Sequence, residues 1–185
     1  MRLHQSKISP ALILAAIITC FLPLMTSAET ADDTNKQAES FQAICLSSWM
    51  KRVSDVGNMA GYKNFGEKYC ACALTQPLDT DAAVDKAIQV CMSRTLLHNT
   101  MDSLEEEVGL DKASDKDISQ FCQDTWNLIY PKMTDQAKET ATNFCNCSQP
   151  KLVALLKNSS NMTDKEYDAQ IDSVAASCSE SIQGG

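Results

Sequence analysis

The sequence predicts an all-α protein made of two similar disulfide-stapled three-helix units, packed on each other as one compact body. A four-cysteine pattern occurs twice, and each copy has a C-x-C pair between two more distant cysteines. The two sets are Cys45, Cys70, Cys72 and Cys91, and then Cys122, Cys145, Cys147 and Cys178. The two tryptophans of the chain, Trp49 and Trp126, each follow the first cysteine of their set by four residues. Apolar residues recur at three- and four-residue steps, and no alternating segment of useful length predicts a strand.

Residues 1–28 have the order of a secretory signal peptide. Two basic residues precede a mostly apolar run over 8–25, and small residues at Thr26 and Ala28 suit the peptidase site. The alternatives are an uncleaved membrane anchor and a lipoprotein attached at Cys20. Prolines interrupt the apolar run, and the residue before Cys20 is not small. We therefore expect cleavage after Ala28, export to the periplasm or medium, and no stable membrane span after that cleavage.

Charge and cysteine content limit the compartments and the kinds of partner that are compatible with this sequence. Removing residues 1–28 takes away one of nine cysteines and two of sixteen basic residues, which leaves eight cysteines and a formal charge of −10. An even cysteine count behind an export signal predicts disulfides. Strong acidity without a Lys/Arg cluster argues against nucleic acid or anionic lipid headgroups as partners. Basic peptides and cations remain compatible with this charge.

The first unit is expected over 38–93, after a flexible lead-in over 29–37. Its first helix should bury one face. That face carries Phe41, Ile44, Cys45, Ser48, Trp49 and Val53. Glycines at 57, 61 and 66 then break the pattern, so the second helix is expected over 67–75. Asp79 or Thr80 can cap the third helix. The buried stripe of that helix is Val84, Ala87, Ile88 and Cys91.

A connecting helix or linker over 94–113 is expected between the units. It carries an apolar stripe that needs a surface to cover it: Leu97, Met101, Leu104 and Val108. Gly109 should end this helix, and the polar stretch over 99–103 is a candidate interruption.

The second unit is expected over 114–181, followed by a tail over 182–185. Ser114 and Asp117 approximate a capping box for its first helix. The apolar face of that helix is Ile118, Phe121, Cys122, Trp126 and Ile129. Thr134 should cap a second helix that ends at 148–150. A separate short helix over 152–156 and a polar turn over 158–161 follow it. Thr163 and Glu166 form a second capping box, which begins the last helix.

The C-x-C spacing predicts how the units are held together. Positions two apart on a helix lie about 200° apart around its axis, so the two cysteines of each pair must reach different helices. Repetition of the pattern favours pairing within each unit, with the middle helix stapled on both sides, and leaves open which cysteine takes which partner. Trp49 and Trp126 lie one turn after a cysteine on the same face, so we expect each to cover a bridge.

No catalytic or cofactor-binding set is recognisable. His98 is the one histidine after residue 28, and no hydrolase motif surrounds it, which suggests a surface or helix-end position. The acidic run over 105–107 lacks EF-hand spacing and is best interpreted as a solvated helix face. The cysteine spacings are unlike a zinc ribbon, so no metal ligands are assigned. Three asparagines fit the glycosylation sequon, which matters in a eukaryotic secretory pathway: Asn146, Asn158 and Asn161.

The leading functional hypothesis is therefore an exported, disulfide-rich binding protein with an unknown protein partner and no catalytic site. Several disulfides make a fold rigid, and a rigid fold suits a preorganised binding surface. The alternative is a carrier of a lipid or other apolar small molecule, because stapled helices rich in Leu, Ile, Met and Ala can enclose a cavity. A thiol-disulfide oxidoreductase is the third class. Neither C-x-C pair has an adjacent cationic residue in the sequence that would clearly favour a thiolate.

Overall fold

The computed structural model describes residues 31–52 and 56–182, and this part of the chain is all-α. Six α-helices form it: α1 (Ala31–Met50), α2 (Met59–Leu74), α3 (Asp81–Glu107), α4 (Asp115–Ile129), α5 (Asp135–Asn158) and α6 (Asp164–Cys178). Two short 3₁₀ helices, η1 (Ser159–Asn161) and η2 (Ser179–Ile182), follow α5 and α6. The predicted signal peptide over 1–28 lies outside the described residues. Within the described part, no helix is both long and apolar enough to cross a membrane.

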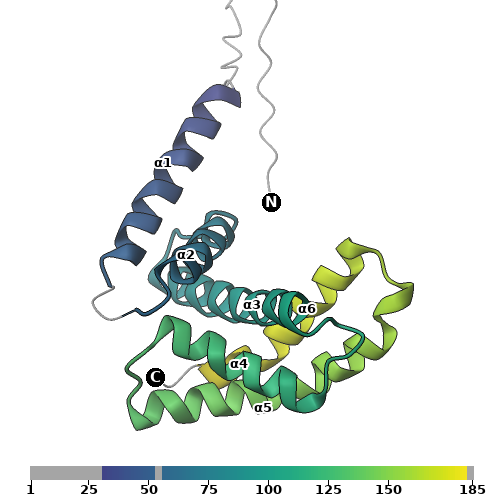
Figure 1. Ribbon diagram of the computed structural model, residues 1–185. Coiled ribbons are helices and arrows are strands. Elements are labelled where there is room, and N and C mark those ends of the chain that lie inside the picture. Colours follow the sequence, from purple (N-terminus) through teal and green to yellow (C-terminus); the bar gives the residue numbers. More distant parts are fainter. Residues whose placement is uncertain (1–30, 53–55, 183–185) are drawn as a thin grey trace, which may run out of the picture.

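Helix α3 lies at the centre of the body and packs on α2, α4 and α6 (Figure 1). Its second half supplies the most deeply buried side chains, among them Leu96, Leu97 and Leu104, all fully buried. The apolar stripe predicted over 94–113 is therefore the core-facing side of a single 27-residue helix, with no interruption over 99–103. Gly109 ends the helix with φ of 86°, and its N–H donates to the Leu104 carbonyl at 3.1 Å.

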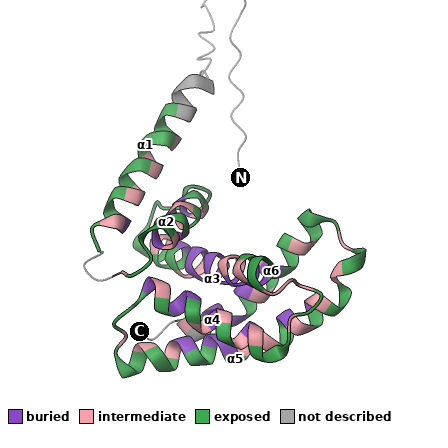
Figure 2. Cartoon of the chain, in the orientation of Figure 1, coloured by how far each residue is buried: buried purple, intermediate pink, exposed green. Residues whose placement is uncertain are grey.

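Helix α1 is the least covered element of the fold (Figure 2). It packs on α2 through its C-terminal part, where Trp49 is buried with 4% of its surface exposed. The predicted buried position of Ile44 is wrong, since 65% of the surface of that residue is exposed. Ile88 on α3 is likewise 47% exposed rather than buried. Helix α1 begins at Ala31, so most of the segment 29–37 is helical, and its flexibility as a lead-in stays a prediction.

Two predicted helix boundaries are wrong, and both errors come from residues that usually break helices. Helix α2 begins at Met59, with the Asn58 side chain accepting from the Gly61 N–H, and it contains Gly61 and Gly66. Helix α5 runs through Pro150, although proline lacks the N–H that would bond to the preceding turn. The predicted end at 148–150 and the separate helix over 152–156 are therefore one continuous helix. Leu152, which follows Pro150 in the same helix, is fully buried, and this burial offsets the lost hydrogen bond.

The predicted starts of α3, α4, α5 and α6 are confirmed. Thr80 and Thr134 each accept a hydrogen bond from a first-turn N–H of α3 and α5. Complete capping boxes begin α4, between Ser114 and Asp117, and α6, between Thr163 and Glu166. Each cap contributes about 1 kcal/mol by satisfying backbone donors that have no partner inside the helix.

All eight cysteines of the described chain form disulfides. The bridges are Cys45–Cys70, Cys72–Cys91, Cys122–Cys145 and Cys147–Cys178. They connect α1 to α2, α2 to α3, α4 to α5 and α5 to α6, so the two cysteines of each C-x-C pair reach different helices. Closing loops of this length stabilises a fold by about 3 kcal/mol per bridge in the chain-entropy model.

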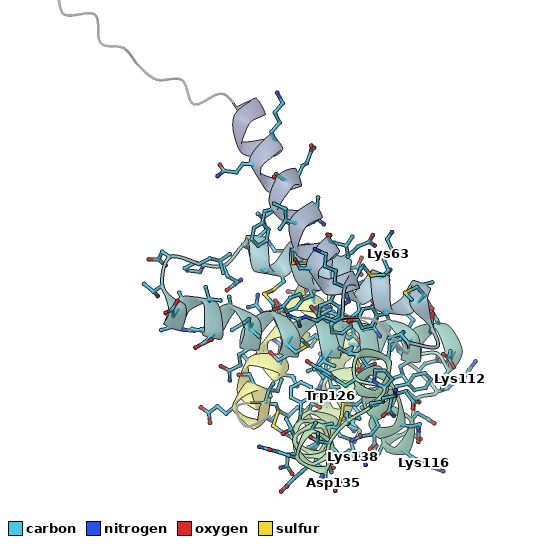
Figure 3. All side chains as sticks on the ribbon, turned by 90° about the vertical axis from the view of Figure 1, so that its left-hand side faces the viewer. Lys63, Lys112, Lys116, Trp126, Asp135 and Lys138 are labelled. Carbon is cyan, nitrogen blue, oxygen red and sulfur yellow. A yellow bond between two sulfur atoms is a disulfide. The ribbon has the colours of Figure 1, made fainter. Side chains whose placement is uncertain are left out.

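One hydrophobic core includes both tryptophans and spans α1 to α6. Figure 3 shows Trp126 within the body, whereas Lys63, Lys112 and Lys116 lie at its outer edge. The helices thus form one compact body.

Candidate functional site

The tryptophans are centres of aromatic clusters rather than exposed stacking platforms. Trp49 stacks on Tyr62 and Phe65, with ring centroids 5.0 and 5.5 Å away, and contacts Tyr69 at 5.3 Å. Its indole Nε1 donates to the Tyr62 carbonyl at 3.1 Å. In the second half of the chain, Trp126 is equally buried at 4% exposure.

Trp126 is held differently from Trp49. It stacks on Tyr130 at 5.7 Å and meets Phe144 edge-on at 6.0 Å. Its buried Nε1 has no hydrogen-bond partner among the described residues. That each tryptophan covers a bridge stays a prediction.

A pocket of about 210 Å³ lies where the C-terminal ends of α1 and α4 meet, and we refer to it as the aromatic pocket. Its lining is Trp49, Arg52, Val56, Tyr62, Ile129, Tyr130, Pro131 and Lys132. Tyr130 is 38% exposed, so part of its ring is available to a ligand. Aromatic and aliphatic walls with two cationic residues make this site suited to an apolar group that carries negative charge.

The tyrosines of this region remain protonated at neutral pH. Burial raises the pKa of Tyr62, Tyr69 and Tyr130, and the positive charge of Arg52 opposes that rise without cancelling it. Each hydroxyl can therefore donate a hydrogen bond. The Tyr62 hydroxyl points toward the Trp49 carbonyl at a long 3.5 Å, so Arg52 and Tyr130 are the polar groups of the pocket that we expect to contact a ligand.

A larger and more polar cleft of about 780 Å³ lies between the start of α2 and the second half of α3. It includes Asn64, Lys68, Asp102 and the acidic run over 105–107. Lys68 and Asp102 form an exposed ion pair at 2.6 Å across the cleft. The acidic run is exposed, as expected for a solvated helix face. In the described ranges, no group of His, Cys, Asp or Glu side chains is arranged to hold a metal ion.

His98 belongs to a charged contact between α3 and α6. Its Nε2 lies 3.2 Å from an Asp172 carboxylate oxygen and its Nδ1 lies 3.9 Å from Asp168. Arg94 Nε approaches the same Asp172 oxygen at 3.6 Å. Of the two positions expected for His98, surface or helix end, the helix end does not apply, because the partly exposed residue lies within α3. The sequence separation of 74 residues hid this contact. Partly exposed pairs of this kind contribute at most about 1 kcal/mol each.

Tyr167 lies on α6 beside this cluster. Burial, with the negative charges of Glu105, Asp102 and Asp168, raises the pKa of Tyr167 to about 12. The phenol is neutral throughout the physiological range, and within the described part of the chain its buried hydroxyl has no hydrogen-bond partner.

The second C-x-C pair has a cationic neighbour that sequence reasoning missed. Lys151 Nζ lies 3.7 Å from Cys147 Sγ and 3.5 Å from Cys178 Sγ, so one ammonium group contacts both sulfurs of the bridge. The same Nζ donates to Ser177 Oγ at 2.6 Å. Lys151 is one helical turn after Cys147, but the predicted end of the helix at 148–150 concealed this spacing. The expectation that neither C-x-C pair has an adjacent cation is therefore wrong for this pair.

Comparisons with family models, with curated proteins and with solved structures find no match for this chain. The aromatic pocket and the contact between Lys151 and the Cys147–Cys178 bridge are the two features from which a function can be inferred.

Proposed function

We propose that this protein is an exported binding protein that recognises a protein partner through the aromatic pocket. Four disulfides in a chain of this size are typical of an oxidising extracellular compartment. The signal-like segment over 1–28 supports the same location. The proposed body consists of two similar units, over 38–93 and 114–181, and the pocket lies at their junction.

The observation that carries the proposal is the composition and size of the aromatic pocket. Small-molecule sites usually measure about 300–1,000 Å³. At about 210 Å³, this pocket is below that range and suits a single side chain. The size therefore favours a protein partner that inserts one anchor residue over a carried lipid, which needs a larger apolar volume.

The lining defines the chemistry of that anchor. Tyr130 and Ile129 offer an apolar wall, and Arg52 and Lys132 place positive charge beside it. We infer that the partner presents an aromatic side chain directly next to a carboxylate. The ring would pack against Tyr130 while the carboxylate pairs with the guanidinium of Arg52.

The bridges support this proposal by limiting the motion of the pocket walls. The Cys45–Cys70 bridge ties α1 to α2, and the Cys122–Cys145 bridge ties α4 to α5. Trp49 and Tyr62 are themselves almost fully buried. A rigid pocket loses little conformational entropy on binding, so even one anchor residue can bind measurably.

A peptide titration tests the proposal. The probe is N-acetyl-Ala-Phe with a free carboxylate, compared with the same peptide as an amide and with N-acetyl-Ala-Ala. The chain has two tryptophans, so its ¹H–¹⁵N spectrum contains two indole signals. We expect the carboxylate peptide to shift the Trp49 indole more than that of Trp126, which does not line the pocket. The amide and the Ala-Ala peptide should shift it less.

Two variants complete this test. Tyr130→Ala removes the stacking surface and Arg52→Gln removes the cation, and both residues are exposed enough for the fold to survive. Each should weaken the response to the carboxylate peptide. Equal responses to all three peptides, or unchanged responses in both variants, would refute the aromatic pocket as the binding site. A lipid that co-purifies with the exported protein in native mass spectrometry would favour the carrier alternative.

A further inference from the structure

The Cys147–Cys178 bridge and the corresponding bridge of the first half differ in the residue that lies four positions after the C-x-C pair. Both bridges join the second cysteine of a C-x-C pair to the last cysteine of its set. Four residues after Cys147 the chain has Lys151, whereas four residues after Cys72 it has Gln76. Gln76 directs its amide to the Thr75 hydroxyl at 2.8 Å. A charged group is therefore present at one bridge, and a neutral group occupies the same offset at the other.

The position of Lys151 has little effect on the oxidised bridge and a large effect on the reduced one. Disulfide sulfurs are neutral and weak acceptors, so the ammonium gains little from them. After reduction, the same ammonium would lie beside a sulfur that can carry a full negative charge, and a nearby Lys lowers the pKa of a thiol. Stabilising the reduced form makes a disulfide more oxidising, and a leaving thiol of lower pKa departs faster.

Burial distinguishes the two sulfurs. Cys147 is partly exposed, while Cys178 is 1% exposed, so an incoming thiolate can reach Cys147 more easily. Lys151 is exposed, yet its bond to Ser177 holds the ammonium over the bridge. The Ser177 hydroxyl also lies 3.8 Å from Cys178 Sγ and offers a second polar neighbour to that sulfur.

We propose that Cys147–Cys178 is a redox-active disulfide that oxidises an external dithiol, with Lys151 stabilising the leaving thiolate. One thiolate of the dithiol attacks Cys147 Sγ, the bond to Cys178 breaks, and Cys178 leaves as a thiolate beside Lys151. The second thiolate of the dithiol then attacks its own sulfur in the mixed disulfide and releases Cys147, which takes up a proton. The dithiol becomes a disulfide, and its two electrons remain on Cys147 and Cys178.

Graded reduction of the intact oxidised protein tests this proposal. Dithiothreitol is the probe, samples are quenched with acid and alkylated, and peptide mass spectrometry follows each of the four bridges separately. We expect Cys147–Cys178 to open first. Lys151→Gln, which copies the side chain at position 76, should slow its opening by about tenfold, the effect of about one pKa unit. Lys151→Arg should retain most of the rate, because it retains the charge.

The sign of the change separates a chemical role of Lys151 from a structural one. Loss of a purely structural contact would loosen the bridge and speed its reduction, whereas loss of thiolate stabilisation slows it. After selective reduction, the pH dependence of alkylation should report a higher thiol pKa at Cys178 in Lys151→Gln than in the wild type. Another bridge opening first, or an unchanged or faster rate in Lys151→Gln, would overturn the proposal.

Discussion

The indole of Trp49 packs directly against the backbone of Gly66, in the space that a side chain at position 66 would occupy. A Cβ placed on Gly66 would lie 2.7 Å from Trp49 Nε1 and 2.8 Å from Cγ, which is too close for any real contact. Glycine is therefore present within α2 because α1 approaches it closely, despite its low helix propensity. In the second half, Ala141 lies four residues before the corresponding cysteine, and the Trp126 indole has no hydrogen-bond partner in the ranges that the structure describes.

Gly66→Ala should therefore destabilise the protein, although alanine favours a helix. The added methyl group must displace the buried Trp49 ring, at a cost of about 1–3 kcal/mol for an overpacked core. Urea unfolding followed by tryptophan fluorescence measures this cost. Gly57→Ala is the matched control, because a Cβ at Gly57 meets nothing within 4 Å. A Gly66→Ala protein as stable as the Gly57→Ala control would contradict this account of the α1–α2 contact.

The two tryptophans should respond unequally to replacement by phenylalanine. Trp49→Phe removes the hydrogen bond to the Tyr62 carbonyl, whereas Trp126→Phe removes an indole N–H that has no partner. Trp49→Phe should therefore cost about 1 kcal/mol more than Trp126→Phe. Chemical denaturation of both variants, followed by far-ultraviolet circular dichroism, provides the comparison. An equal or larger loss in Trp126→Phe would show that the unpaired indole is satisfied by a group outside the described contacts.

The two capping boxes should make stability depend on pH in the acidic range. Hydrogen bonds from the Ser114 hydroxyl and N–H lower the pKa of Asp117 below 3.8, and bonds from the Thr163 N–H and hydroxyl lower the pKa of Glu166 below 4.5. Because both folded values are depressed, this stabilisation is complete above the unfolded values and is lost as the pH falls through the folded ones.

An Asp117→Asn/Glu166→Gln double variant tests this dependence. Its stability deficit relative to the wild type should be largest at neutral pH and should shrink as the pH falls to about 2. Urea unfolding at a series of pH values measures the difference. A deficit that stays constant with pH would mean that the carboxylate charge does not contribute to the caps.

Removing two different bridges should have two different effects. The Cys122–Cys145 bridge lies in the central core, so Cys122→Ala/Cys145→Ala should lower the free energy of global unfolding by about 3 kcal/mol. The Cys45–Cys70 bridge anchors α1. Among the described helices, α2 is the one with which α1 has extensive contacts. Its removal should therefore speed hydrogen exchange in α1 more than in α4 and α5. Uniformly faster exchange across all six helices would instead indicate that α1 is needed for the whole fold.

Features that depend on neighbouring residues in the sequence were predictable, and features that depend on distant partners were not. The caps at Thr80 and Thr134 were predictable because each threonine accepts a hydrogen bond from the N–H only three residues later in the sequence. The exposure of Ile44 depends on which face of α1 meets α2, and periodicity alone cannot decide this.

The candidate sites follow the same rule. Repetition of the C-x-C pattern made pairing within each half predictable, since the sequence itself shows the repeat. The aromatic pocket depends on Tyr62 and Tyr130, which are far apart in sequence and unremarkable in composition. The contact of Lys151 with the Cys147–Cys178 bridge was not predictable, because a proline such as Pro150 usually ends a helix, whereas here the helix continues.

The order of the four bridges also determines what a single cut of the backbone would do. Four of the five loops between successive described helices lie inside a segment closed by a disulfide, so a cut there leaves the pieces covalently joined. The loop between α3 and α4, over 108–114, lies outside every such segment. A protease that cleaves this loop would yield two separate chains held together by non-covalent packing, mainly of α3 on α4 and α6, with smaller contacts of α3 with η2 and of α2 with α4. Nicking at this loop would thus turn one chain into two non-covalently associated fragments, and we expect fragments expressed separately to reassemble at the same seam.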